Sequence, residues 1–157
     1  MNSWRILVVD DDADISTLVA ELLRLAGHRT TTAASGTAAL AALTEPVDDG
    51  LPDLVLLDVQ MPELDGWDTL RAIRARPATA ALPVVLCTVK SGPVDTELGW
   101  SLGCDGYVVK PFAIGDLVAE IEAVLGRSAE ERVARRAEAV RLQREVYGAR
   151  APDGAAR

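Results

Sequence analysis

The chain has 157 residues, of which 49% are apolar and 25% charged, a composition typical of one globular domain and unlike that of a disordered chain. The net charge of −8 is uneven, because residues 1–126 hold 8 basic and 19 acidic residues, whereas residues 127–157 hold 8 basic and 5 acidic ones. Phosphate neutralisation dominates non-specific affinity for nucleic acid, so we expect no direct nucleic-acid contact from so acidic a domain.

The sequence also argues against membrane insertion and disulfide bonding. The longest apolar runs, at residues 6–9 and 54–57, are far shorter than the roughly 20 residues that a membrane helix needs. No segment at the start has the charged and apolar regions of a signal peptide. Cys87 and Cys104 have neither the number nor the spacing of a disulfide framework or a zinc site. We therefore expect a cytoplasmic protein.

The first part of the chain alternates between strand and helix patterns. An aliphatic run at residues 5–9 is followed by apolar residues with the spacing of an amphipathic helix, which Gly27 ends. The Thr-rich residues 29–33 predict a second strand, and Ser35 can cap the Ala- and Leu-rich helix that runs on to about residue 45. His28 is predicted to lie in a surface turn and has no apparent metal partner.

Three more strand–helix pairs follow. The predicted strands are residues 54–57, 83–87 and 107–109, and each precedes a helical pattern, around residues 67–73, 94–102 and 114–125. Five alternations imply right-handed crossovers and a doubly wound parallel sheet with helices on both faces. The pattern closes at about Gly126, which predicts one domain over residues 1–126 and an extension over residues 127–157.

Charged and polar side chains stand where the predicted strands end. Asp10 and Asp11 follow the first strand, Asp58 the third, Thr88 the fourth and Lys110 the fifth. Ligands of open parallel sheets bind beyond the carboxyl ends of the strands, so these side chains are expected to share one pocket. The chain has only two lysines, at positions 90 and 110, and both follow predicted strands.

Three clustered carboxylates repel one another, so the predicted pocket needs a cation. Oxygen ligands with retained waters are what Mg²⁺ prefers. An aspartate beside Mg²⁺ and a lysine suits the chemistry of an aspartyl phosphate, because the metal and the ammonium neutralise charge on the transferred phosphoryl group. Asp12 continues the acidic run, and we expect it to be a carboxylate at the start of the first helix.

Four motifs in the expected order resemble the receiver domain of two-component response regulators. They are VVDDD at residues 8–12, LLDVQMPELDG at 56–66, CT at 87–88 and GYVVKPF at 106–112. The resemblance covers residues 5–126. Within the family, the chain is similar to stand-alone receivers of the chemotaxis-regulator type. The resemblance implies a flavodoxin-like α/β fold with a five-stranded parallel sheet in the order 2-1-3-4-5.

The resemblance assigns the acceptor and the metal ligands. Asp58 is implied to receive a phosphoryl group from a phosphohistidine on a partner kinase. Asp11 and Asp58 are implied to bind Mg²⁺ with their carboxylates, together with the backbone carbonyl of Gln60, while Asp10 supports the metal through water. A protein of this family is not a conventional enzyme but a phospho-acceptor that assists its own phosphorylation and dephosphorylation.

The resemblance also implies how the phosphoryl group is sensed. Lys110 is expected to pair with its oxygens, and Thr88 to swing its hydroxyl toward them while Tyr107 moves inward behind it. Pro111 resembles the cis-proline of the family. Gly66, in the loop after Asp58, is expected to matter for backbone shape only.

Residues near the predicted acceptor depart from the family pattern or set its access. Val89 occupies a position where receivers usually have alanine or glycine, and its extra methyl groups are expected to narrow access to the phosphate. Gln60 and Lys90 flank the same access and are expected to tune hydrolysis. For Trp100, packing against the core and a contact with a partner both remain open; with Tyr107 it falls on the face that binds partners in this family.

The extension begins with a capping-box pattern at Ser128 and predicts a helix to about Tyr147. Its apolar residues form a narrow stripe, with two more on the other side; they are Val133, Ala137, Val140 and Tyr147, and Leu142 and Val146. A solvated or loosely docked helix and a contact with a partner or a second copy of the chain both remain open. Residues 148–157 are predicted to be disordered.

These observations favour a stand-alone response regulator, because 31 residues after the receiver are too few for an ordinary output domain. The expected partners are a sensor histidine kinase or a histidine phosphotransfer protein, and a downstream protein target. The alternative is a phosphorelay intermediate or phosphate sink, in which Asp58 passes its phosphate to another histidine. A phosphatase of the haloacid dehalogenase type fits poorly, since its nucleophile ends the first strand and Asp58 would be unexplained.

Overall fold

A computed structural model describes residues 2–45 and 50–148 of the chain. The strands are β1 (Arg5–Val9), β2 (Arg29–Ala33), β3 (Leu54–Leu57), β4 (Val84–Thr88) and β5 (Gly106–Val109). The helices are α1 (Ala13–Leu25), α2 (Gly36–Thr44), α3 (Gly66–Ala75), α4 (Pro93–Leu102), α5 (Ile114–Leu125) and α6 (Ala129–Gly148). The predicted elements are all present, with ends shifted by a residue or two. The prediction of disorder for residues 148–157 falls almost entirely outside the described residues.

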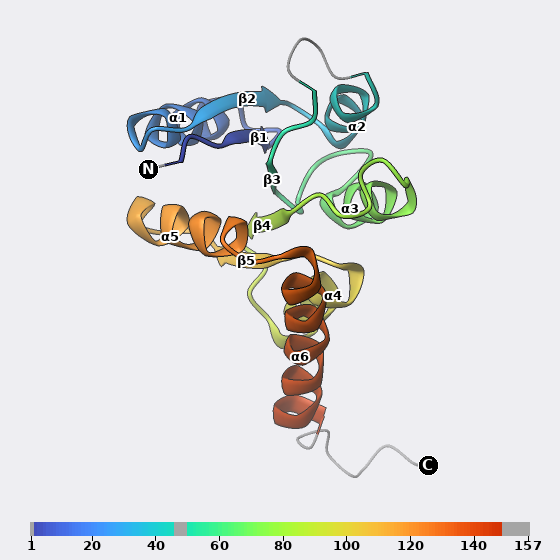
Figure 1. The fold of residues 1–157 in the computed structure, drawn as a ribbon. Coiled ribbons are helices and arrows are strands. Elements are labelled where there is room, and N and C mark those ends of the chain that lie inside the picture. Colours follow the sequence, from blue (N-terminus) through green and yellow to red (C-terminus); the bar gives the residue numbers. More distant parts are fainter. Residues whose placement is uncertain (1, 46–49, 149–157) are drawn as a thin grey trace.

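The five strands form one parallel sheet in the order β2-β1-β3-β4-β5, which confirms the expected flavodoxin-like topology. Figure 1 shows helices on both sides of this sheet, with α1 and α5 on one face and α2, α3 and α4 on the other. The core is accordingly divided into two layers, because successive side chains of a strand point to opposite faces.

The central strand β3 is apolar throughout, and all four of its residues are buried. Ile6 and Val8 of β1 pack toward α1 and α5, whereas Leu7 and Val9 pack toward α2 and α3. Full burial of such an aliphatic side chain contributes about 1.5–3 kcal/mol. This packing fixes the carboxyl ends of β1 and β3 beside each other.

Side-chain caps start three helices close to the ends of the strands that precede them. Asp12 accepts hydrogen bonds from the backbone N–H groups of Asp14 and Ile15 at the start of α1, as expected for a helix-start carboxylate. Ser35 caps α2 and Asp65 caps α3 in the same way. The short loop between β1 and α1 therefore holds Asp10 and Asp11 in a defined place.

His28 is buried, so the prediction of a surface turn was wrong for its side chain. Gly27 does form the turn, with a φ of 98° that favours glycine. The imidazole lies under the start of β1, where its Nδ1 accepts a hydrogen bond from the Trp4 N–H at 3.3 Å. β2 begins at the next residue and pairs with β1, and this pairing draws the ring into the protein.

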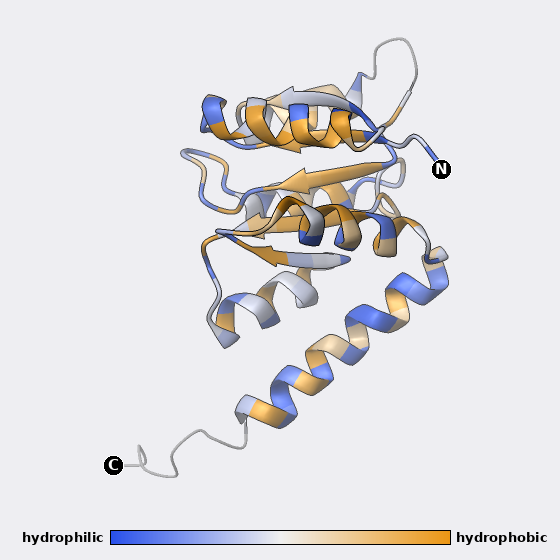
Figure 2. Ribbon diagram, turned by 90° about the vertical axis from the view of Figure 1, so that its left-hand side faces the viewer, coloured by the Kyte–Doolittle hydropathy of each residue, from blue (hydrophilic) through white to orange (hydrophobic). Residues whose placement is uncertain are grey.

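The last helix, α6, follows α5 and lies beside α4 (Figures 1 and 2). Among the described residues, no helix combines the length and the apolar composition needed to cross a membrane.

Candidate functional site

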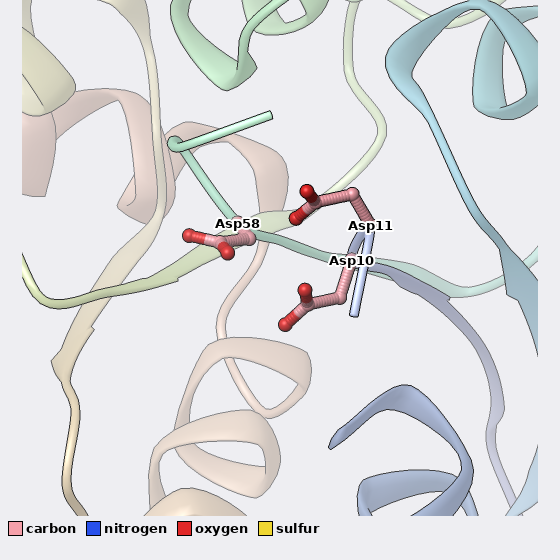
Figure 3. A group of neighbouring side chains, drawn as sticks. All are labelled: Asp10, Asp11 and Asp58. Carbon is pink, nitrogen blue, oxygen red and sulfur yellow. The ribbon is translucent and has the colours of Figure 1, made fainter. Parts of the chain in front are cut away.

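Three carboxylates meet at the carboxyl ends of β1 and β3 (Figure 3). Asp10 and Asp11 directly follow β1, and Asp58 directly follows β3. One oxygen of each carboxylate lies within 4.8 Å of the others. Asp10 and Asp58 are buried, whereas Asp11 is exposed and faces the same space. The close approach of three acidic groups at one edge of the sheet makes this region the candidate site.

The two buried carboxylates differ in how firmly they are held. Both oxygens of Asp10 accept short hydrogen bonds, one from the Asp12 N–H at 2.9 Å and one from the Lys110 ammonium at 2.7 Å. The bonds to Asp58 are longer, at 3.3 Å from the Gln60 N–H and 3.4 Å from Lys110. Asp10 is thus a fixed anchor for the lysine, and Asp58 is the buried carboxylate with weaker partners.

Lys110 reaches the site from the end of β5, on the far side of β4. Its ammonium lies between Asp10 and Asp58, and its side chain is 20% exposed. The peptide bond between Lys110 and Pro111 is cis, as the family resemblance implies. The ammonium is therefore the positive group closest to Asp58 among the described residues.

The protein environment disfavours the charged form of Asp58 and favours the charged form of Lys110. Burial raises the pKa of the Asp58 carboxyl, the charge of Lys110 only partly offsets this, and the charge of Asp10 raises it further. Burial by itself lowers the pKa of Lys110, but the hydrogen bond to Asp10 and the charges of Asp58 and Asp10 outweigh burial and raise it. The lysine therefore stays charged at neutral pH, while this one ammonium does not fully offset the cost of burying the Asp58 carboxylate.

A small pocket lies next to these groups, and α1 and β4 supply part of its wall. It is lined by Asp10, Asp58 and Lys110 together with apolar and small side chains, among them Ile15 and Ser16 of α1 and Cys87 of β4. Burial raises the pKa of the Cys87 thiol to about 12, so this group remains a neutral wall residue. Sequence analysis did not connect Ile15 or Ser16 with the site, although both lie one helical turn after the acidic run.

The loop after Asp58 returns close to the acceptor strand, and this explains the glycine at position 66. A Cβ atom at Gly66 would lie 2.3 Å from the backbone oxygen of Asp58 and 2.5 Å from the Cα atom of Val59. The Gly66 N–H also donates to the Val59 carbonyl at 2.8 Å. A side chain at position 66 would therefore push the backbone of Asp58 out of place.

A chain of hydrogen bonds joins Thr88 to Tyr107. The buried Thr88 hydroxyl accepts from the Lys90 N–H at 3.2 Å, and the Tyr107 hydroxyl donates to the carbonyl of Lys90. Burial raises the pKa of the Tyr107 hydroxyl, which therefore keeps its proton as a donor. Among the described residues, no hydrogen bond joins Thr88 to Asp58 in this arrangement.

Comparison with known proteins assigns this architecture. The family model for the response regulator receiver domain matches residues 6–122. The chain belongs to the response regulator receiver family. The match includes all the residues of the candidate site and all five strands except Arg5, the first residue of β1.

Two curated relatives and one solved structure illustrate the similarity. The receiver is 42% identical over 127 residues to the DNA-binding response regulator MtrA of Mycobacterium tuberculosis, which covers 81% of this chain and 53% of that protein. It is 42% identical over 124 residues to the transcriptional regulatory protein CpxR of Escherichia coli, covering 79% and 50%. The chain thus spans about half the length of these relatives. The chemotaxis response regulator CheY4 of Vibrio cholerae superimposes with a TM-score of 0.71 and 29% identity, over 78% of this chain and 99% of that one.

Other residues singled out in the receiver sequence are not among the described residues that line the pocket. Val89 is 55% exposed and is not among the described residues that line the pocket. Trp100 is half-buried and packs against the core layer of α2, α3 and α4. Tyr107 is also half-buried and packs on the same layer. Lys90 contributes its backbone to the link between Thr88 and Tyr107.

Proposed function

We propose that this receiver accepts a phosphoryl group on Asp58 from a phosphohistidine of a sensor kinase or a histidine phosphotransfer protein. The observation that carries the proposal is the contrast between the two buried carboxylates. Asp10 uses both oxygens in short hydrogen bonds, whereas Asp58 has longer ones and lies within reach of both the lysine and Asp11. The same contrast argues against a nucleophile at the end of the first strand, as a haloacid-dehalogenase-type phosphatase would require.

In the proposed transfer, an oxygen of the Asp58 carboxylate attacks the phosphorus of the phosphohistidine. The new P–O bond forms as the P–N bond breaks, and the imidazole leaves. Lys110, held by Asp10, neutralises charge on the phosphoryl oxygens, since its ammonium already lies 3.4 Å from Asp58. The Gln60 N–H orients the carboxylate before the reaction.

The donor set fits Mg²⁺, which would supply the remaining positive charge for the transferred phosphoryl group. Three carboxylates face a single ammonium, and their oxygens lie within 4.8 Å of one another. Asp11 and Asp58 would hold the ion directly, with the Gln60 carbonyl, and Asp10 would support it through water. Hard oxygen ligands of this kind suit Mg²⁺ rather than a softer metal.

The proposal is tested by locating the phosphoryl group directly. The protein is incubated with phosphoramidate and Mg²⁺, reduced with borohydride to convert an acyl phosphate into an alcohol, digested and sequenced by tandem mass spectrometry. We expect homoserine at position 58 and at no other aspartate, and none when Mg²⁺ is chelated. Modification at Asp10 or Asp11, or none at all with Mg²⁺ present, contradicts the assignment.

Exposed apolar residues next to the pocket mark where the donor protein would dock. Ile15 lines the pocket and is 37% exposed, and Leu18, one turn further along α1, is 56% exposed. A phosphohistidine has to approach Asp58 to within about 3–3.5 Å, so its protein must cover the start of α1. Apolar side chains that stay exposed in this way are typical of interaction sites.

Leu18→Asp is therefore expected to slow phosphotransfer from a phosphorylated histidine kinase at least tenfold, because a charge replaces an apolar contact. Phosphorylation by phosphoramidate, which needs no docking surface, should stay within twofold of wild type. Leu25→Asp is the matched control, since Leu25 is 84% exposed at the other end of α1. Radiolabel transfer over time measures both rates. Equal slowing by the two variants would contradict docking at the part of α1 beside the pocket.

Val89→Ala is expected to change the lifetime of the phosphorylated protein by a few-fold, equivalent to about 1 kcal/mol in the barrier. Val89 directly follows Thr88 and its side chain is 55% exposed, so we propose that it borders the path of water and donors to Asp58. Val94→Ala provides the control, because Val94 is 80% exposed within α4. Release of phosphate over time is the measurement, and unchanged release from the Val89 variant would exclude this role.

We further propose that residues 1–126 are the receiver unit of a stand-alone regulator in the cytoplasm. Phosphorylation would draw the Thr88 hydroxyl toward Asp58 and shift Tyr107, and the output would be binding of a protein target. The acidic charge of the domain supports a protein rather than a nucleic-acid target, whereas MtrA is described as DNA-binding. Gel-shift titration of the phosphorylated chain against DNA separates the two outputs.

The alternative function is a phosphorelay intermediate or phosphate sink, in which Asp58 passes its phosphoryl group to another histidine. The same acceptor site, with Lys110 bound to Asp10, would serve this function. Incubation of the phosphorylated receiver with a histidine phosphotransfer protein discriminates between the two. Rapid return of the phosphoryl group to histidine, without a partner that binds only the phosphorylated form, favours the alternative function.

A further inference from the structure

The helix α6 covers the outer face of α4. The two helices are in contact, and Figures 1 and 2 show α6 running beside α4 and beyond it. The side that faces the receiver carries the half-buried residues Arg132, Arg136, Val140 and Gln143. The apolar residues Val133 and Val146 are more than half exposed. Polar contacts, rather than the apolar stripe of the sequence, therefore hold most of this helix in place.

The main attachment is a buried carboxylate at the start of β5. The side chain of Asp105 is fully buried and accepts from the Val84 N–H at 3.0 Å and from Arg74 of α3 at 2.9 Å. Its other oxygen accepts from Arg136 of α6 at 2.8 Å, and Arg132 lies 3.9 Å away. A buried carboxylate without such partners is strongly destabilising, and α6 supplies the partners of the second Asp105 oxygen.

Two further contacts extend this attachment along the helix. Arg132 donates to the carbonyl of Ala81 at 3.0 Å, just before β4. Arg144, three turns on, donates to Glu97 of α4 at 2.7 Å. We call Arg132, Arg136 and Arg144, with their partners, the α6 latch. It ties α6 to both ends of the segment that contains β4 and α4.

The helix α4, which the latch contacts, has few stabilising contacts of its own. Gly99 is the only buried residue of α4. The N-cap residue of the helix, Gly92, makes no side-chain hydrogen bond. A Cβ atom at Gly99 would lie 3.0 Å from the ring of Tyr107, so this glycine lets the ring pack directly on the helix. α4 is thus held from inside by Tyr107 and from outside by α6. Elements with so few buried contacts are the ones that move at low cost.

Hydrogen bonds connect the turn before this helix to Thr88, the residue proposed to turn toward the phosphoryl group. Lys90 immediately precedes the turn into α4, and its N–H and carbonyl are bonded to Thr88 and Tyr107. If the Thr88 hydroxyl turned toward a phosphoryl group on Asp58, the bond to Lys90 would be lost. The turn before α4 and the ring of Tyr107 would then be free to shift together.

We propose that the α6 latch holds α4 in the arrangement of the unphosphorylated protein, and that phosphorylation of Asp58 loosens the latch and uncovers the outer face of α4. This inference rests on the proposed function of Asp58. Coupling between two sites is reciprocal, so the latch also opposes occupation of the acceptor site by the same factor.

The test uses the full chain with Mg²⁺ and beryllium fluoride, which mimics a phosphoryl group on an aspartate. Hydrogen exchange read by mass spectrometry reports the protection of residues 129–148. We expect these amides to exchange about fivefold faster in the loaded protein, at the lower end of common coupling factors. Unchanged exchange of α6 in a protein that binds beryllium fluoride overturns the latch and leaves the acceptor assignment intact. A protein that binds none overturns both.

Two pairs of variants test the reciprocal effect. Arg136→Gln and Arg144→Gln each remove a contact of the latch, and calorimetric titration should show about fivefold tighter binding of beryllium fluoride. Arg135→Gln and Arg141→Gln are matched for charge, since Arg135 is exposed and Arg141 forms its ion pairs, among the described residues, with Glu138 and Glu145 of its own helix. If the control pair tightens binding equally, or if the latch variants speed exchange of α6 without tightening binding, the proposal is wrong.

Discussion

Asp58→Asn is expected to abolish phosphoryl uptake from phosphoramidate, leaving no added phosphate by intact-mass spectrometry. The amide removes the anionic nucleophile and one of the three oxygen ligands, while its shape is nearly that of aspartate. Lys110 keeps its short bond to Asp10, so the site should retain its architecture. Asp14→Asn is the control, because Asp14 is an exposed carboxylate in the first turn of α1 and should leave uptake unchanged.

The same variant should be at least as stable as wild type at pH 7 without metal, which separates lost chemistry from lost folding. Burial raises the pKa of the Asp58 carboxyl in the folded protein above its ordinary value of 3.8. The carboxylate therefore costs folding free energy once the pH exceeds the folded-state pKa, and this cost disappears as the pH falls toward 3.8. Urea unfolding in EDTA at several pH values checks the sign. A variant less stable at pH 7 than at acid pH, relative to wild type, would contradict it.

Asp105→Asn is expected to lower the free energy of unfolding by about 3 kcal/mol. The substitution removes the negative charge that neutralises Arg74 and Arg136, whose side chains are only 13% and 16% exposed. The amide nitrogen also faces a guanidinium, where it has no acceptor. Breaking a buried pair on one side is costly because the remaining charge stays out of water.

Urea unfolding measures this loss as a lower midpoint. Asp68→Asn removes a carboxylate from an ion pair with Arg71 that is about half exposed, and it should cost less than about 1 kcal/mol. If the two variants lose the same stability, the buried ion pairs of Asp105 stabilise the protein no more than a surface ion pair does, and the prediction is wrong.

Much of the fold could be predicted because its signals are local. Each signal lies within a few residues of the element that it marks. The apolar run 54–57 marks a strand that ends at an aspartate, Gly27 marks the end of a helix and Ser35 marks the start of the next. The strand ends then bring Asp10, Asp11, Asp58 and Lys110 to one edge, since parallel strands share a direction. Their gathering follows from topology alone, although the roles proposed for them do not.

The contacts that local patterns do not encode were missed. Asp105 falls between two predicted elements, where no local pattern marks it, and its pairing with Arg136 joins residues 31 positions apart. Arginines at positions 132 and 136 look like an ordinary solvated helix face until a buried carboxylate lies opposite them. His28 was misplaced for a related reason, because its burial depends on the start of β1, far away in sequence.

The scarcity of lysine has a practical consequence. Fourteen of the sixteen basic residues are arginines, and the two lysines, at positions 90 and 110, both follow strands that end at the edge of the sheet that holds the carboxylates. Amine-directed acylating dyes will therefore label side chains only there, and Lys110, bound to Asp10, should react more slowly than its neighbour at position 90. The ratio of the two yields offers a chemical gauge of what occupies the space beside Asp58.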